Sequence, residues 1–349
     1  MEQPMTTANQ PLKGTITHTS PQDSLRFDWL VLLLSTWWVG GIFVDGWAHN
    51  HIPLLETFFT PWHAILYSGF AVTGLFLVAV ALRNHARGYH WLRSLPRGYM
   101  ISLWGVCIFA LGGLLDLTWH LLFGIEKGTD ALLSPTHLLL ALGVALAASG
   151  PLRAAWRRPV AEQKETLLTL LPAILSLAYL LAIFTFFTQY ASPIVHSWAD
   201  KHTSEEPLDL GLASILLQTA LFMGVALFAM RRWRLPLGTF ALLFMINSTL
   251  GSILANNSPI LAVALVSFLT GLLVDLLYQA LKPAIERREA LRLFAFFAPV
   301  VIQTAYFLTL FAINGLAWSV HLWVGSIFMS GVVGLLLSYL LASPSVQQE

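Results

Sequence analysis

The sequence predicts an all-α, polytopic integral membrane protein, a bundle of about ten transmembrane helices. Of its 349 residues, 56% are hydrophobic and 11% are charged, whereas about a quarter of the residues of an ordinary soluble domain are charged. The mean hydropathy is +0.70, and the apolar residues fall in runs near the ~20 residues that a helix needs to cross a bilayer. These runs predict helices, because an open-ended segment in hydrocarbon satisfies all its backbone amides only as a helix.

Ten apolar segments are long enough to span a bilayer. They are 28–49, 61–82, 99–123, 135–152, 166–188, 210–230, 236–255, 259–281, 293–313 and 319–342. Residues 1–26 are polar and lack the apolar core of a secretory signal, so they predict a disordered cytoplasmic tail. We expect residues 343–349 to form a second cytoplasmic tail.

Lys and Arg residues predict the orientation of the bundle. They are concentrated in every second connection, at 83–97, 153–164, 231–234 and 282–292, whereas the alternate connections hold only Lys127 and Lys201. By the positive-inside rule, this pattern predicts a multi-pass protein of the cell membrane with both termini in the cytoplasm.

The predicted orientation places most histidines at or near the outer side of the membrane. These are His49, His51, His63, His120, His137, His196, His202 and His321. Imidazoles and carboxylates are costly within spanning segments, so a one-sided cluster of them indicates a functional site.

Two hairpins, within 27–152, carry the same polar pattern. In each copy an Asp-x3-His ends one helix, and an acid-x3-Ser/Thr-Pro-x-His opens the next. The first copy is formed by Asp45, His49, Glu56, Thr60, Pro61 and His63, and the second by Asp116, His120, Asp130, Ser134, Pro135 and His137. The pattern predicts a duplicated helical hairpin, with residues 153–342 forming supporting transmembrane helices.

The spacing within each copy has a local structural meaning. An Asp and a His four residues apart lie on one face of a helix, where they can bind one ion or each other. Thr60 and Ser134 are predicted N-caps, each followed by a proline at the first helical position, where a missing N–H costs nothing. His63 and His137 then fall in the first turn. We therefore expect four helix ends to meet at one membrane depth.

Neutral imidazole nitrogen and carboxylate oxygen form a ligand set for transition metals. Zinc or iron fits this set best, and copper(II) or manganese also fits, while the motifs hold no Met or Cys for a soft Cu(I) site. Two copies favour a dinuclear centre. Asp45 and Asp116 can instead orient the histidines without binding the ion. Two alternatives remain open, namely a polar network without metal and haem ligation, which would leave the paired acids unexplained.

Two further residues are candidate catalytic groups. Glu126 lies between the two parts of the second motif and is either a general acid or base or a loop carboxylate beside Lys127. His321 begins the last predicted helix at the depth expected for His63 and His137, which makes it a candidate ligand or proton carrier. The single cysteine, Cys107, excludes a disulfide framework or a cysteine-based cluster within one chain.

The stretch from Asp116 to Pro151, and above all Leu132-Leu-Ser-Pro-Thr-His-Leu-Leu-Leu140, resembles bacterial polytopic membrane proteins to which no activity is assigned. The similarity covers about a tenth of the chain. It implies a multi-pass membrane fold and carries no activity, cofactor or residue role.

These observations favour a metal-dependent membrane enzyme, a hydrolase or an oxidoreductase, with its site near the outer face of the bilayer. Its partners are expected to be the lipid bilayer and a lipid-like or small apolar substrate, and a net charge of +1 gives no sign of nucleic-acid binding. A metal-transporting or proton-coupled permease is the main alternative, because carboxylates and histidines in a helical bundle also mark ion paths. A non-catalytic assembly or structural subunit is the third.

Overall fold

The computed structural model describes residues 20–52, 59–124, 126, 128–159, 166–200, 208–255 and 259–341. Over these ranges the protein is helical, with two isolated β-bridges and no strand. The α-helices are α1 (Leu25–His51), α2 (Pro61–Ala86), α3 (Met100–Phe123), α4 (Thr129–Leu133), α5 (Pro135–Ala148), α6 (Gly150–Arg157), α7 (Leu167–Phe187), α8 (Leu208–Met230), α9 (Thr239–Leu254), α10 (Ile260–Leu281), α11 (Arg288–Ile313) and α12 (Val320–Leu341). Two short 3-10 helices are η1 (Trp91–Arg93) and η3 (Gln189–Ala191).

Among the described residues, eight helices are long and apolar enough to cross a membrane. The polytopic helical bundle is therefore confirmed, whereas the count of ten spans is not. Helices α5 and α6 meet at a bend of 42° and make a ninth span only if they are taken together. The bend has a local cause, since Pro151 lies in the first turn of α6 and a proline cannot continue the hydrogen-bond ladder of the preceding helix. Helix α9, with 16 residues, is shorter than a typical span.

Close helix crossings hold α1 against α2 and α3 against α5. A Cβ atom added at Gly69 would lie 2.7 Å from Cα of Trp38, and one added at Gly143 would lie 2.7 Å from the backbone nitrogen of Phe109. Such contacts leave no room for a side chain, which is why glycine stands at these crossings. The two pairs are thereby fixed at short interhelical distances.

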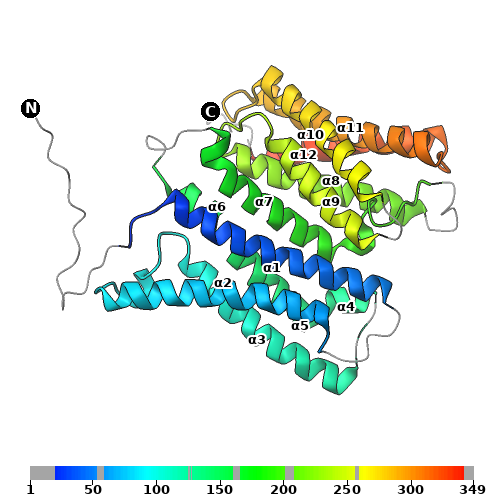
Figure 1. The fold of residues 1–349 in the computed structure, drawn as a ribbon. Coiled ribbons are helices and arrows are strands. Elements are labelled where there is room, and N and C mark those ends of the chain that lie inside the picture. Colours follow the sequence, from blue (N-terminus) through cyan, green and yellow to red (C-terminus); the bar gives the residue numbers. More distant parts are fainter. Residues whose placement is uncertain are drawn as a thin grey trace, which may run out of the picture.

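Helix α7 lies between the two halves of the bundle. In Figure 1 the helices α1, α2, α3 and α5 lie on one side of it, and the helices from α8 to α12 lie on the other. Leu177 and Leu181 belong to the apolar core of the second half, while Tyr179 and Ile183 belong to that of the first. The end of α1, the start of α2 and the short helix α4 meet at one end of the bundle (Figure 1, right), where the candidate site is formed.

Candidate metal centre

The first of two polar groups is formed by Asp45, His49 and His63, here called the first triad. Asp45 and His49 lie one turn apart near the end of α1, and His63 lies in the first turn of α2. Nε2 of His63 lies 3.4 Å from Oδ2 of Asp45, and Nε2 of His49 lies 3.8 Å from the same oxygen. The predicted N-cap is confirmed, because the backbone N–H of His63 donates to Oγ1 of Thr60 at 3.1 Å.

The second triad is formed by Asp116, His120 and His137. Asp116 and His120 lie near the end of α3, and His137 lies in the first turn of α5. Here the two histidines contact different oxygens of the Asp116 carboxylate. Nε2 of His120 lies 3.4 Å from Oδ2, and Nε2 of His137 lies 3.4 Å from Oδ1. Ser134 caps α5 as predicted, since it accepts a hydrogen bond from the backbone N–H of His137.

The two triads have closely similar internal geometry. The imidazole centroids are 5.7 Å apart and the rings are inclined by 56° both in the His49–His63 pair and in the His120–His137 pair. In each triad, one ligand atom from every residue lies within 4.8 Å of the other two. Two nitrogens and one carboxylate oxygen at this separation could hold a transition metal ion and leave further coordination positions open.

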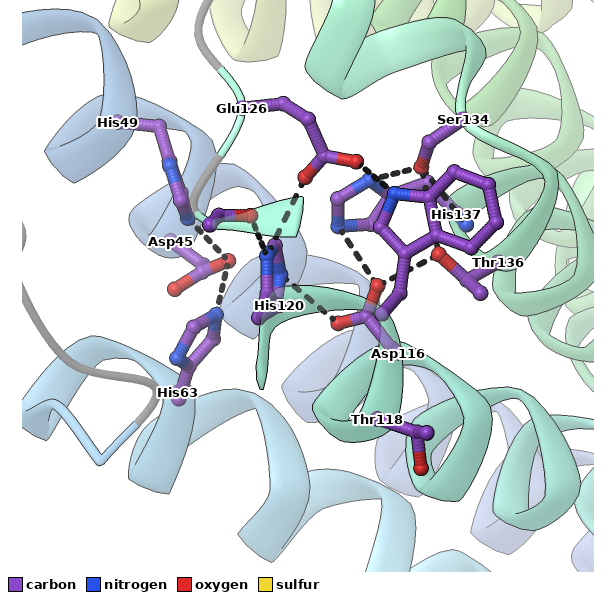
Figure 2. Close-up of polar contacts among 12 residues, drawn as sticks. Asp45, His49, His63, Asp116, Thr118, His120, Glu126, Ser134, Thr136 and His137 are labelled. Carbon is purple, nitrogen blue, oxygen red and sulfur yellow. Dashed lines mark hydrogen bonds and ion pairs between the residues drawn. The ribbon is translucent and has the colours of Figure 1, made fainter. Parts of the chain in front are cut away.

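Hydrogen bonds hold all three members of the second triad (Figure 2). The hydroxyl of Thr136 donates to Oδ1 of Asp116 at 2.8 Å. Nδ1 of His137 lies 2.7 Å from Oγ of Ser134, and Nδ1 of His120 lies 3.2 Å from the carbonyl oxygen of Gly124. Because Nδ1 of each ring is engaged, Nε2 is the nitrogen that faces the carboxylate and is available to an ion.

Glu126 joins the second triad from the α3–α4 connection. Its Oε2 lies 3.2 Å from Nδ1 of His120, and its Oε1 accepts a hydrogen bond from the indole N–H of Trp119. Figure 2 shows this carboxylate beside the imidazole of His120. The position suits a group that orients His120 or exchanges a proton with it.

The carboxylate of the first triad is held by fewer contacts among the described residues than that of the second. Oδ1 of Asp45 is buried and has no hydrogen-bond partner within the described residues. The side chains of Asp45 and His49 are 13% and 22% exposed, whereas those of Asp116 and His120 are 2% and 6% exposed. The Asp45 carboxylate is therefore more exposed than that of Asp116, and its Oδ1 has no hydrogen-bond partner among the described residues.

Both triads border one pocket, which encloses about 760 Å³ of space between atoms, the open space at its mouth included. Asp45 and His49 line it from the first triad, His137 lines it from the second, and Glu126 also lines it. The other lining side chains are mainly apolar and include Ile42, Leu66, Phe109, Leu140, Val144, Phe186 and Phe187. The polar centre thus faces an apolar chamber within the bundle.

The remaining candidate residues lie elsewhere or outside the described ranges. Asp130 is exposed in the first turn of α4 and belongs to neither triad. His321 is exposed at the start of α12, which packs on α8 and α11 rather than on the helices of the triads. Glu56 lies outside the described residues.

Sequence reasoning did not single out Thr136 or Tyr67. Thr136 occupies the variable position of the Ser-Pro-x-His motif, where the first copy has Trp62. Tyr67 follows His63 by one turn and packs its hydroxyl group against Gly113 of α3, so that it lies between the two helix pairs. A comparison of the two motifs position by position would have singled out Thr136, while no sequence pattern indicated Tyr67.

Comparison of the chain with protein-family models, with curated proteins and with solved structures gives no match.

Proposed function

We propose that this protein is a metal-dependent integral membrane enzyme, a hydrolase or an oxidoreductase, that acts on a lipid-like or small apolar substrate. The observation that carries the proposal is the pair of Asp-His-His triads on one apolar pocket. We place the enzyme in the cell membrane with both termini in the cytoplasm, on the strength of the Lys and Arg pattern. The site then lies near the outer face of the bilayer.

The ligand set supports zinc or iron, with copper(II) or manganese as further options. Catalytic zinc sites commonly use three protein ligands and keep a fourth position open, and non-haem iron sites use two histidines and one carboxylate. When bound, such an ion supplies a Lewis acid that activates water or O2. In the second triad, Ser134 orients His137, and Gly124 and Glu126 orient His120.

We further propose that the two hairpins are copies of one ancestral unit. The matching ring geometry of the two triads supports this, as do the glycine crossings at equivalent places. Gly69 lies six residues after His63, and Gly143 lies six residues after His137. Gly69 packs against Trp38, and Gly143 packs against Phe109. Trp38 and Phe109 each lie seven residues before the motif aspartate, Asp45 or Asp116. Two copies of one unit then supply two similar ion sites side by side.

The packing on the far side of the pocket favours an enzyme over a permease. Trp38, Phe43 and Phe109 are at most 1% exposed and belong to the apolar core that α1, α2, α3, α5 and α7 share. A permease would need a continuous polar path through this layer toward the other face of the membrane. Large buried aromatic side chains in that place instead suit the closed floor of a substrate chamber.

Turnover in proteoliposomes tests the proposal. The full-length protein, loaded with zinc or with iron, is incubated with a membrane lipid extract and with small hydrocarbons under air, and products are identified by mass spectrometry. In parallel, entry of the same metal into the vesicles is measured. We expect a product that requires metal, and no metal uptake above that of empty vesicles.

The double variant His63→Ala with His137→Ala removes one nitrogen ligand from each triad and should abolish the product. His321→Ala is the matched control, because this exposed histidine of α12 belongs to neither triad. Metal uptake without any product would instead identify a permease, and a product that the double variant still forms would place the chemistry elsewhere.

A further inference from the structure

The two triads offer the same donor atoms but differ in what surrounds them. Each has two imidazole nitrogens and one carboxylate, with ligand atoms within 4.8 Å of one another. A difference in their affinity for an ion must therefore come from the groups that hold the ligands in place. Partners of this kind commonly change metal affinity by about 10–100-fold.

The ligands of the second triad are fixed before any ion arrives. Thr136 holds Asp116 at 2.8 Å, Ser134 holds His137 at 2.7 Å, and His120 contacts the Gly124 carbonyl oxygen at 3.2 Å. Asp116 is 2% exposed, so little water competes with an ion for its oxygens. Ligands that are already oriented lose little conformational freedom on binding, which raises affinity.

The corresponding position in the first triad cannot provide the same support. Trp62 stands where the second motif has Thr136, and an indole ring has no hydroxyl group to hold the carboxylate. Oδ1 of Asp45 is accordingly buried without a hydrogen-bond partner in the described part of the chain. Two members of this triad, Asp45 and His49, line the pocket, against one member of the second triad.

We infer that the triads are two unequal metal sites: the second triad binds one divalent transition metal ion tightly, and the first triad binds another more weakly and presents it to the substrate. This inference rests on the proposed function. It assigns Thr136 as a positioning residue that acts through Asp116.

Titration with cobalt(II), whose visible absorption reports coordination, tests the inference on detergent-purified full-length protein stripped of metal. We expect two bound ions per chain, with dissociation constants that differ by about tenfold or more. Thr136→Val keeps the shape of the side chain and removes its hydroxyl group. It should raise the dissociation constant of the tighter ion by about 10–100-fold and leave the weaker one unchanged.

Thr118→Val is the matched control on α3. Its hydroxyl group donates to the carbonyl oxygen of Leu114 in the same helix, and the residue is exposed, so both dissociation constants should stay as in the wild type. Asp45→Asn should remove the weaker ion and Asp116→Asn the tighter one. The wild-type titration needs no variant, so the inference remains testable if Asp116→Asn does not fold.

Two ions of equal affinity would overturn the inference and leave the proposed function standing. An unchanged dissociation constant of the tighter ion in Thr136→Val would also overturn the inference and leave the proposed function standing. A chain that binds no cobalt at all would contradict both the inference and the proposed function.

Discussion

Ser134 combines two roles at the start of a helix that carries a site histidine, and Thr60 shares the first of them, as a helix cap. Ser134 accepts the backbone N–H of His137 and also lies 2.7 Å from Nδ1 of its ring, while Thr60 accepts the backbone N–H of His63. The Ser134 hydroxyl group therefore both caps α5 and orients the imidazole of His137.

Ser134→Ala should lower the free energy of unfolding by about 0.5–2 kcal/mol, the usual effect of losing an N-cap, and should also weaken metal binding. Thr60→Ala should have a similar effect on stability. Thermal denaturation in detergent and metal content measure the two effects. Ser134→Thr keeps a capping hydroxyl and should retain most of the stability, so equal melting temperatures for Ser134→Ala and the wild type would contradict this role.

Individual residues show what spacing can and cannot predict. The pairing of Asp45 with His49, and of Asp116 with His120, follows from four-residue spacing on one helix, and both pairings are present. The contacts of these aspartates with His63 and His137 depend on how two helices cross, and the spacing of residues along the sequence does not determine that crossing. The motif also predicts Asp130 as a ligand, but this residue lies in the separate helix α4, where it is exposed.

At the scale of helices, the crossing of α1 and α2 brings the first triad together. A Cβ atom at Gly41 would lie 2.7 Å from Cα of Leu66, and that contact is with backbone, which cannot move aside. The neighbouring Gly40 has nothing within 4 Å of the same position. Gly41 lies one turn before Asp45, so a shift of the helices there moves Asp45 away from His63.

Gly41→Ala should therefore push α1 away from α2 and lower the melting temperature. It should also weaken metal binding by the first triad. Gly40→Ala is the matched control and should leave the metal content unchanged, because its added methyl group meets no atom. Metal content and melting temperature of both variants can be measured side by side. Equal behaviour of the two would show that the crossing does not set the site.

Helix boundaries were predicted well where caps are explicit and less well elsewhere. Pro61 and Pro135 begin α2 and α5 as the Thr-Pro and Ser-Pro pairs indicated. The predicted span 135–152 instead breaks at Ser149, because the Pro151 ring interrupts the hydrogen-bond ladder. Apolar composition alone predicted a full span at 236–255, but α9 begins only at Thr239 and has 16 residues.

Across the whole molecule, a buried ion pair ties together segments that are far apart in the chain. Asp28 in α1 is 1% exposed, forms an ion pair with Arg158 after α6, and accepts a hydrogen bond from the hydroxyl group of Tyr99 at 2.6 Å. Arg158 is linked onward, since Arg232 donates to its carbonyl oxygen at 2.7 Å. The network joins the start of α1 to both halves of the bundle.

Arg158→Met should destabilise the protein by about 3–5 kcal/mol, because it leaves the buried carboxylate of Asp28 without its cation. Tyr99→Phe removes one hydrogen bond and should cost less, about 1.5–3 kcal/mol for a bond to a charged group. Denaturation in detergent gives both values. A smaller effect for Arg158→Met than for Tyr99→Phe would contradict the assignment of the ion pair as the main link.

The arrangement of the whole bundle places two similar triads on one pocket, and the metal content of the purified protein tests this most directly. Elemental analysis of the detergent-purified, full-length wild type should find about two transition metal ions per chain, one for each triad. The double variant His63→Ala with His137→Ala should lose them, while His321→Ala keeps them. A wild type free of metal, or a double variant with unchanged metal content, would contradict the account.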